Sequence, residues 1–370
     1  MPSEPRAPAA GRAGQPPSAT NEPASGTERT SCPEHSSGTG RPPGIGQHSG
    51  AEVSSVPEES SGTGQPRAGE HSRTPQSFRA GHEPSLPRPS SPAGPARVGD
   101  LRPSLGGVLC YWLLPVRRRV ILDNLRQVFG DGLDPRARRR VAQCFYSHVL
   151  RSVAEYLTTI WTSRRRQAER VDIVGVEHLF AAEKAGKGIL ILTGHFGNWE
   201  LASVAAMLQY ERYHGRFHVI RKSLSAGLEP LVFGRFSRAG LKVIPARDAL
   251  GAVLRALGGN DVVIFILDQH TKVRSPKGIA VEFFGRPAGT NRSLALVAGH
   301  SGAPVIPATS YRKPDGRHVL RFETPLEWIA HDDPAEEQRR NTRRYNEVLE
   351  RFVLEHPDQW FWMHRRWKSR

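Results

Sequence analysis

The sequence predicts an α/β fold with a central, mostly parallel or mixed sheet flanked by helices and preceded by a disordered N-terminal tail. Two observations carry this prediction. Short apolar runs alternate with helical patterns after about residue 160, and the composition changes sharply near residue 100. Alternation of this kind is typical of sheets whose helices cover both faces.

Each predicted strand is a run of four to six mostly apolar residues. We expect strands at 171–174, 188–192, 217–220, 241–244, 262–267, 279–283, 305–309 and 318–322. Apolar residues spaced by three or four predict helices at 135–160, 201–209, 228–239, 249–257, 293–299 and 334–355.

The first 100 residues have a composition that cannot form a core. They contain 17 of the 30 prolines, few large apolar side chains, and 9 arginines against 10 acidic residues, a net charge of −1. Such segments bury too little apolar surface to offset the entropy of folding. We therefore expect residues 1–100 to be disordered and residues 101–370 to form one domain.

The remaining 270 residues carry a net charge of +17, which indicates an anionic partner such as nucleic acid, an acidic lipid surface or a phosphorylated substrate. Three scattered cysteines, Cys32, Cys110 and Cys144, fit neither a disulfide framework nor a zinc site. We therefore expect the protein to bind no metal and to reside in a reducing cytoplasm.

Residues 101–120 are predicted to form an interfacial membrane element. The apolar run from Leu105 to Val116 is shorter than the roughly 20 residues of a spanning helix, and it contains Trp112 and precedes three arginines. An ordinary buried helix is the alternative. Near the C-terminus, Trp360, Trp362 and Trp367 alternate with basic residues. This pattern fits lipid headgroups, core packing or stacking on single-stranded nucleic acid.

The most informative stretch is 186–208, GKGILILTGHFGNWELASVAAML, which joins a buried strand, a turn and a helix start. His195 lies in the turn, Asn198 is a candidate N-cap, and Glu200 follows in the first helical turn. An imidazole held by a carboxylate can remove a hydroxyl proton, so His195 and Glu200 are the candidate catalytic pair. A structural histidine beside a helix-start carboxylate is the alternative.

His195 to Glu200 also matches H-x4-[DE], and here the chain resembles the lipid A biosynthesis late acyltransferases (lauroyl and myristoyl acyltransferases) of the lysophospholipid acyltransferase superfamily. The resemblance runs from about Leu105 to Arg370. It includes NLR with Phe129, HVIRKSL, LDQH, EFFGRPAGT, SGAPVIP and HPDQWFWMHRRWK.

This resemblance implies a lysophospholipid or glycerol-phosphate acyltransferase-like fold and direct acyl transfer. His195 would be the general base with Glu200 as its partner. The donor would be an acyl carrier protein or coenzyme A thioester, with no further cofactor and no covalent acyl-enzyme. The acceptor would be a hydroxyl of a lipid A precursor, or of another glycolipid, such as a phosphatidylinositol mannoside, or a lysophospholipid. The place of action would be the cytoplasmic face of the inner membrane, with peripheral or monotopic attachment.

Six further residues are candidate substrate-binding groups. Arg221, after a strand, would grip an acceptor phosphate, and Arg247 is a second candidate. Asp268 ends an apolar run at the sheet edge where α/β folds build their sites, and would orient one of these arginines. The remaining candidates are Asn198 and, in the loop predicted at 283–290, Arg286 and Thr290.

The rival function class is a non-catalytic basic module that binds membranes or nucleic acid. The strand-end histidine beside a helix-start carboxylate argues against it, so we expect no nucleic-acid partner.

Overall fold

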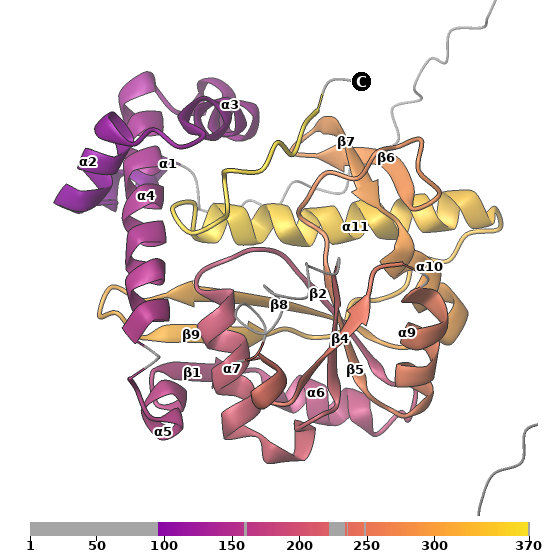
Figure 1. Ribbon diagram of the computed structural model, residues 1–370. Coiled ribbons are helices and arrows are strands. Elements are labelled where there is room, and N and C mark those ends of the chain that lie inside the picture. The colour runs from indigo at the N-terminus through magenta and orange to yellow at the C-terminus, as the bar shows by residue number, and fades with distance from the viewer. Residues whose placement is uncertain (1–94, 159–160, 222–233, 235, 248, 369–370) are drawn as a thin grey trace, which may run out of the picture. The chain divides into compact units, whose positions relative to one another are not determined.

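A seven-stranded sheet in the order β1-β9-β8-β2-β5-β3-β4 lies at the centre of the computed structural model (Figure 1). The structure describes residues 95–158, 161–221, 234, 236–247 and 249–368. Strands β8, β2, β5, β3 and β4 are parallel to one another, whereas β9 runs antiparallel to β8 and pairs in parallel with β1. The predicted mostly parallel or mixed sheet flanked by helices is therefore confirmed.

The strand predictions agree with the structure to within three residues at either end. The strands are β1 (Val171–Val174), β2 (Ile189–Thr193), β3 (Phe217–Arg221), β4 (Leu241–Pro245), β5 (Val262–Ile266), β6 (Gly278–Phe283), β7 (Arg286–Asn291), β8 (Val305–Arg312) and β9 (His318–Phe322). β7 was expected to be part of a loop. It pairs antiparallel with β6 in a separate two-stranded sheet.

Helices precede the sheet, cover its faces and close the chain. They are α1 (Pro95–Asp100), α2 (Leu105–Leu113), α3 (Arg118–Phe129), α4 (Pro135–Thr158), α5 (Arg164–Ala168), α6 (Val176–Glu183), α7 (Trp199–Gln209), α9 (Ala249–Gly258), α10 (Ser293–Ser301) and α11 (Pro334–Glu355). Short 3₁₀ turns span Gly130–Gly132 and Glu211–Tyr213. Most of the helix predicted at 228–239 lies outside the described residues.

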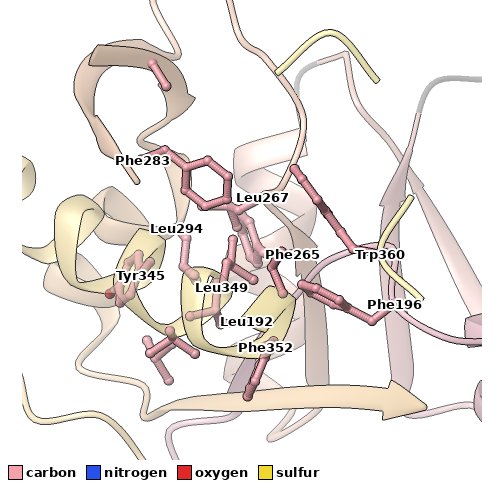
Figure 2. Packing of buried hydrophobic residues seen from close by; sticks show 14 of the residues in the cluster. Leu192, Phe196, Phe265, Leu267, Phe283, Leu294, Tyr345, Leu349, Phe352 and Trp360 are labelled. Atoms are coloured by element: carbon pink, nitrogen blue, oxygen red, sulfur yellow. The ribbon is translucent and has the colours of Figure 1, made fainter. Parts of the chain in front are cut away.

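Side chains of β2 alternate between two hydrophobic clusters, as expected for a strand buried on both faces. Leu190 and Leu192 pack in the cluster that includes residues of α9, α10 and α11. Ile189 and Ile191 pack in the opposite cluster with α6 and α7. Figure 2 shows the first cluster, in which Leu192 lies among residues of β5 and α11 and the indole of Trp360.

The tail prediction needs one correction at its boundary. Residues 1–94 lie outside the described residues, but α1 falls inside the predicted tail and Val98 is buried at 2% exposure. Arg140 of α4 donates to the Gly99 carbonyl at 3.2 Å. The folded domain therefore includes α1, because α1 packs onto α4.

The predicted interfacial segment forms α2, which lies against α4 (Figure 1). The helices approach closely at Gly107, where a Cβ atom would lie 1.9 Å from the Ser147 hydroxyl oxygen. The outer side of α2 and the segment after it expose Leu105, Leu109, Trp112, Leu113, Leu114 and Val116, and α4 exposes Leu150, Val153 and Leu157. An ordinary buried helix does not fit this exposure.

None of the helices in the described part of the chain combines the length and the hydrophobicity that a membrane crossing requires.

Candidate active site

The site lies where the parallel strands end. His195 follows β2, and Asp268 follows β5, which pairs with β2 from Ile189↔Val262 to Thr193↔Ile266. Parallel neighbours end at the same edge of a sheet, and that edge is where open α/β sheets build their sites. Two residues that are 73 positions apart in the sequence are therefore brought into contact.

Asp268 holds His195 through two hydrogen bonds. Its Oδ1 accepts a hydrogen bond from His195 Nδ1 at 2.9 Å, and its Oδ2 accepts from the His195 backbone N–H at 2.9 Å. Trp360 Nε1 also donates to Oδ2, at 3.0 Å. Because Nδ1 carries the donated proton, Nε2 of a neutral ring keeps its lone pair and can act as a base.

Burial and charge set the protonation of this pair. Burial alone would raise the pKa of Asp268, but the nearby His195 and the hydrogen bonds from His195 and Trp360 outweigh it and lower the pKa to about 2. Burial alone would lower the pKa of His195, and the Asp268 carboxylate overcomes this and raises it. Asp268 is thus ionised at neutral pH and stabilises the imidazolium that a proton transfer would create.

The rest of the His195 surroundings is aromatic and amide in character. Trp199 meets the ring edge-on, with the centroids 5.0 Å apart, and Phe361 lies 6.1 Å away. The amide nitrogen of Gln269 lies 3.4 Å from Nδ1 and 3.3 Å from Nε2. Nearly equal distances place this amide over the ring rather than in line with the Nε2 lone pair. With 18% of its side chain exposed, His195 is still reachable from solvent.

The turn that presents His195 is fixed by its own sequence. Gly197 has φ +57°, which favours glycine, and a Cβ atom there would lie 2.5 Å from the Ser310 carbonyl oxygen. Asn198 caps α7 as predicted, because its Oδ1 accepts from the Leu201 N–H at 3.2 Å. Its amide nitrogen Nδ2 donates to Glu155 Oε2 at 2.8 Å, so both ends of this buried amide are committed to the fold. That commitment favours a structural role for Asn198 over substrate contact.

A buried polar network supports the turn from α4. Arg312, at the end of β8, donates to both carboxylate oxygens of Glu155, at 3.0 and 2.6 Å, and to His148 Nδ1 at 2.8 Å. That contact leaves the proton of His148 on Nε2, which donates to the Gly197 carbonyl at 3.2 Å. Burial and the Arg312 charge lower the pKa of His148 to about 3, so its ring is neutral. The network ties the turn after β2 to α4 and to the end of β8.

Glu200 lies in the first turn of α7, as predicted, where the helix dipole favours a carboxylate. The carboxylate that hydrogen-bonds Nδ1 of His195 is Asp268, however, and not Glu200. The prediction pairs His195 with Glu200, which is nearer in the sequence than Asp268. Asp268 was itself a candidate, but for orienting an arginine.

Arg221 is the last residue of β3, two strands away from β2, and aligns with Pro245 of β4. Because the parallel strands share an edge, the Arg221 backbone lies on the same side of the sheet as the His195 turn, about 10 Å along it at the usual strand spacing. Arg247 is exposed in the loop after β4, still farther along the sheet.

The two candidates on the β6–β7 hairpin differ from each other. Arg286 is exposed at the hairpin turn. Thr290 has 0% exposure, and its hydroxyl accepts from Arg366 Nη2 at 2.7 Å. The proposed substrate contact of Thr290 is therefore corrected, because its side chain is enclosed by the fold.

The aromatic and basic C-terminus lies mostly inside the protein. Trp360, Trp362 and Arg366 are 1%, 0% and 0% exposed, which decides for core packing over a headgroup or nucleic-acid surface at these positions. Arg366 donates to the Gly289 carbonyl at 2.7 Å and lies 4.6 Å from the centre of the Phe283 ring. This segment also supplies Trp360, whose indole donates to Asp268.

Among the described residues, no group of three histidine, cysteine or acidic side chains is placed to hold a metal ion.

The chain is similar to known acyltransferases. The family model described as bacterial lipid A biosynthesis acyltransferase matches residues 103–369. A lipid A biosynthesis lauroyltransferase from Escherichia coli (strain K12) is 25% identical over 265 residues, which are 71% of this chain and 83% of that protein. A phosphatidylinositol mannoside acyltransferase from Mycobacterium tuberculosis (strain ATCC 25618 / H37Rv) is 30% identical over 174 residues, 44% of this chain and 50% of that protein.

Among solved structures, the 1-acyl-sn-glycerophosphate (LPA) acyltransferase PlsC from Thermotoga maritima matches 68% of this chain and 96% of its own, with 17% identity and a TM-score of 0.31. The family match covers almost the whole described domain. The chain belongs to the bacterial lipid A biosynthesis acyltransferase family and is an O-acyltransferase.

Proposed function

We propose that the protein transfers a fatty acyl group from an acyl carrier protein or coenzyme A thioester to a hydroxyl of a lipid A precursor, with His195 as the general base. The observation that supports this proposal is the contact between His195 Nδ1 and the buried Asp268 carboxylate, which leaves Nε2 available to a substrate hydroxyl. Relatives named as a lauroyltransferase and a palmitoleoyltransferase of lipid A biosynthesis support the acceptor class.

The chemistry follows from this arrangement. His195 Nε2 takes the proton of the acceptor hydroxyl while its oxygen bonds to the thioester carbonyl carbon. The tetrahedral intermediate collapses with cleavage of the carbon–sulfur bond, and the imidazolium returns the proton to the departing thiolate. The ester and the free thiol are the products. Asp268, in place of Glu200, keeps the ring oriented and balances its positive charge.

Substrate contacts and attachment are parts of the same proposal. Arg221, at the sheet edge of the site, would bind an acceptor phosphate, with the exposed Arg247 and Arg286 as further cationic groups. The exposed apolar side chains of α2 and α4 would rest in the interfacial region of the inner membrane on its cytoplasmic side, which suits a lipid acceptor.

Purified protein and its His195→Ala variant test the proposal. With a lipid A precursor as acceptor, each is supplied in turn with acyl carrier protein and coenzyme A thioesters, and the acylated lipid is followed by mass spectrometry. We expect transfer from at least one donor, and a loss of about 10² to 10⁴ in rate for the variant, typical of a missing general base. A His195→Ala enzyme with near-normal turnover would contradict the assignment.

A second acceptor class is favoured by three phosphatidylinositol mannoside acyltransferases among the relatives, which are 27% to 30% identical over 163 to 174 residues. The same assay with a phosphatidylinositol mannoside, and with a lysophospholipid, separates these acceptors. Transfer to one of these lipids and none to the lipid A precursor would replace the first acceptor by the second while leaving the role of His195 intact.

A further inference from the structure

His364 presents a second imidazole to the catalytic centre. Its ring centroid lies 6.2 Å from that of His195, with the ring planes at 46°, and 5.9 Å from that of Phe361. No group in the described part of the chain hydrogen-bonds either ring nitrogen of His364. The ring therefore has a donor and an acceptor available to a bound molecule.

The backbone that carries this ring is held from the N-terminal helices. The buried Asn124 of α3 donates from its amide nitrogen to the carbonyls of Trp362, at 2.8 Å, and His364, at 2.5 Å. Arg117 donates to the Met363 carbonyl at 3.2 Å. Three consecutive carbonyl groups are thus fixed by residues about 240 positions away, which places His364 with little freedom.

The electrostatic surroundings keep this ring neutral. Burial lowers the pKa of His364, Asp268 opposes this by raising it, and the charges of His195, Arg117 and Lys368 lower it again, for a net decrease. A neutral imidazole offers one N–H donor and one acceptor nitrogen. Unlike a cation, it does not raise the free energy of the imidazolium that forms on His195.

We propose that His364 is a further catalytic residue, whose ring N–H hydrogen-bonds the thioester carbonyl oxygen and stabilises the negative charge that develops on it. This inference rests on the proposed function of His195. The proton, the acyl carbon and the thiolate follow the route already described. His364 keeps its own proton throughout, so no further reactant is needed.

The spacing of the two rings suits this division of work. A base nitrogen must lie about 2.6 to 3.2 Å from the attacking oxygen, and a donor about 2.7 to 3.1 Å from the oxyanion. Those two oxygens are bonded to one carbon, so two imidazoles that reach them have their centres at most about 10 Å apart, and about 6 to 8 Å apart when the rings converge on the carbon from neighbouring directions. The distance between His195 and His364 falls within that range.

A second proton acceptor at this position would serve no purpose, because Asp268 already secures the tautomer of His195. A purely structural role for the ring is also poorly supported, since the backbone contacts place the segment without it. Stabilisation of the oxyanion is the task that remains in acyl transfer.

The test compares three substitutions of His364 with one matched control. His364→Ala removes the donor, whereas His364→Asn and His364→Gln each restore an amide N–H, at about the positions of Nδ1 and Nε2. His300→Ala is the control, because it removes an exposed imidazole from the end of α10. Each variant is assayed in detergent for kcat and for KM of acceptor and donor, and its melting temperature is measured.

We expect His364→Ala to lose about 10² to 10³ in kcat, the usual effect of removing one oxyanion donor, with little change in either KM. One of the two amide variants should recover at least tenfold over alanine, and His300→Ala should match the unaltered enzyme. If the melting temperature of His364→Ala is markedly lower than that of the unaltered enzyme, His364→Leu, whose side chain fills the space of the ring, is assayed instead.

Two results would overturn the role of His364. One is a kcat within threefold of the unaltered enzyme in the folded alanine or leucine variant. The other is two folded amide variants that are both as slow as alanine. A failure of the proposed function looks different, because it appears as near-normal turnover of His195→Ala or as no transfer from either thioester by the unaltered enzyme.

Discussion

Replacement of Asp268 by asparagine should remove the base from the enzyme by changing the tautomer of His195. The carboxylate accepts three hydrogen bonds, from Nδ1 and the backbone N–H of His195 and from the indole of Trp360. An amide has one oxygen, so its orientation decides which donors are satisfied. If its oxygen faces Nδ1, its NH₂ group faces the other two donors, both of which are then left without an acceptor.

The reverse orientation satisfies every group at the expense of catalysis. The asparagine oxygen then accepts from the backbone and from the indole, and its NH₂ donates to Nδ1, which forces the ring proton of His195 onto Nε2. Each unsatisfied buried donor costs about 1 to 3 kcal/mol, so the active tautomer is disfavoured by about 2 to 6 kcal/mol. At about 1.36 kcal/mol for each factor of ten, the expected loss in kcat is about 30-fold to 10⁴-fold.

The pH dependence supplies an independent measurement of the same pair. Activity requires a neutral His195, whose pKa is raised by Asp268, so activity falls as pH decreases through a value above the ordinary pKa of histidine. Asp268→Asn removes that negative charge, and the acidic limb of the kcat/KM profile should move to lower pH. The control is Asp261→Asn, the same change in the His218–Asp261 pair at the opposite end of β5.

The reasoning would be refuted by a folded Asp268→Asn enzyme that keeps kcat within threefold of the unaltered enzyme. If the acidic limb of the kcat/KM profile stays at the same pH in Asp268→Asn, only the claim that Asp268 raises the pKa of His195 would be refuted.

Three further predictions concern stability, attachment and the tail. Arg312→Met leaves Glu155 without its guanidinium partner, and the free energy of unfolding in urea should fall by about 3 to 5 kcal/mol; a loss below 1 kcal/mol would count against the network. Trp112→Ser with Leu113→Ser removes two exposed apolar side chains and should weaken liposome binding at least tenfold in flotation at high salt, whereas unchanged binding would exclude α2 from the contact. Deletion of residues 1–90 should leave kcat within threefold, since the described fold begins at Pro95, and an inactive but folded product would show a function in that segment.

Much of the sheet is predictable because its strands are buried on both faces. Residues 318–322 and the helix 334–355 match the predicted bounds, since apolar runs and helical periodicity report burial directly. β7 is not predicted because it lacks such an apolar run. Its sequence, RPAGTN, contains proline and glycine and few apolar residues, and it becomes a strand only by pairing with β6.

The sequence predicts which residues belong to the candidate site but not which of them contact one another. His195 and Asp268 each end an apolar run, a local signal, whereas their contact depends on β5 being the neighbour of β2. Spacing in the sequence favours Glu200 as the partner of His195, because it indicates only contacts between residues that are close together in the chain. The burial of Trp360 and Arg366 likewise depends on the return of the C-terminus across α3 and the β6–β7 hairpin, which no periodicity encodes.

The helix α4 has two faces with different neighbours. Leu150, Val153 and Leu157 are exposed along one side, while His148 and Glu155 on the other side hold the turn after His195. A helix is stiff over the roughly 10 Å that separate these residues along its axis. If the outer side rests in a bilayer as proposed, its depth would set the height of the His195 imidazole above the lipid surface. The geometry of one helix would then fix how far the enzyme reaches into a headgroup, and hence which hydroxyl it acylates. Substitution of apolar residues on the outer side of α4 should therefore change the position of acylation more readily than the rate.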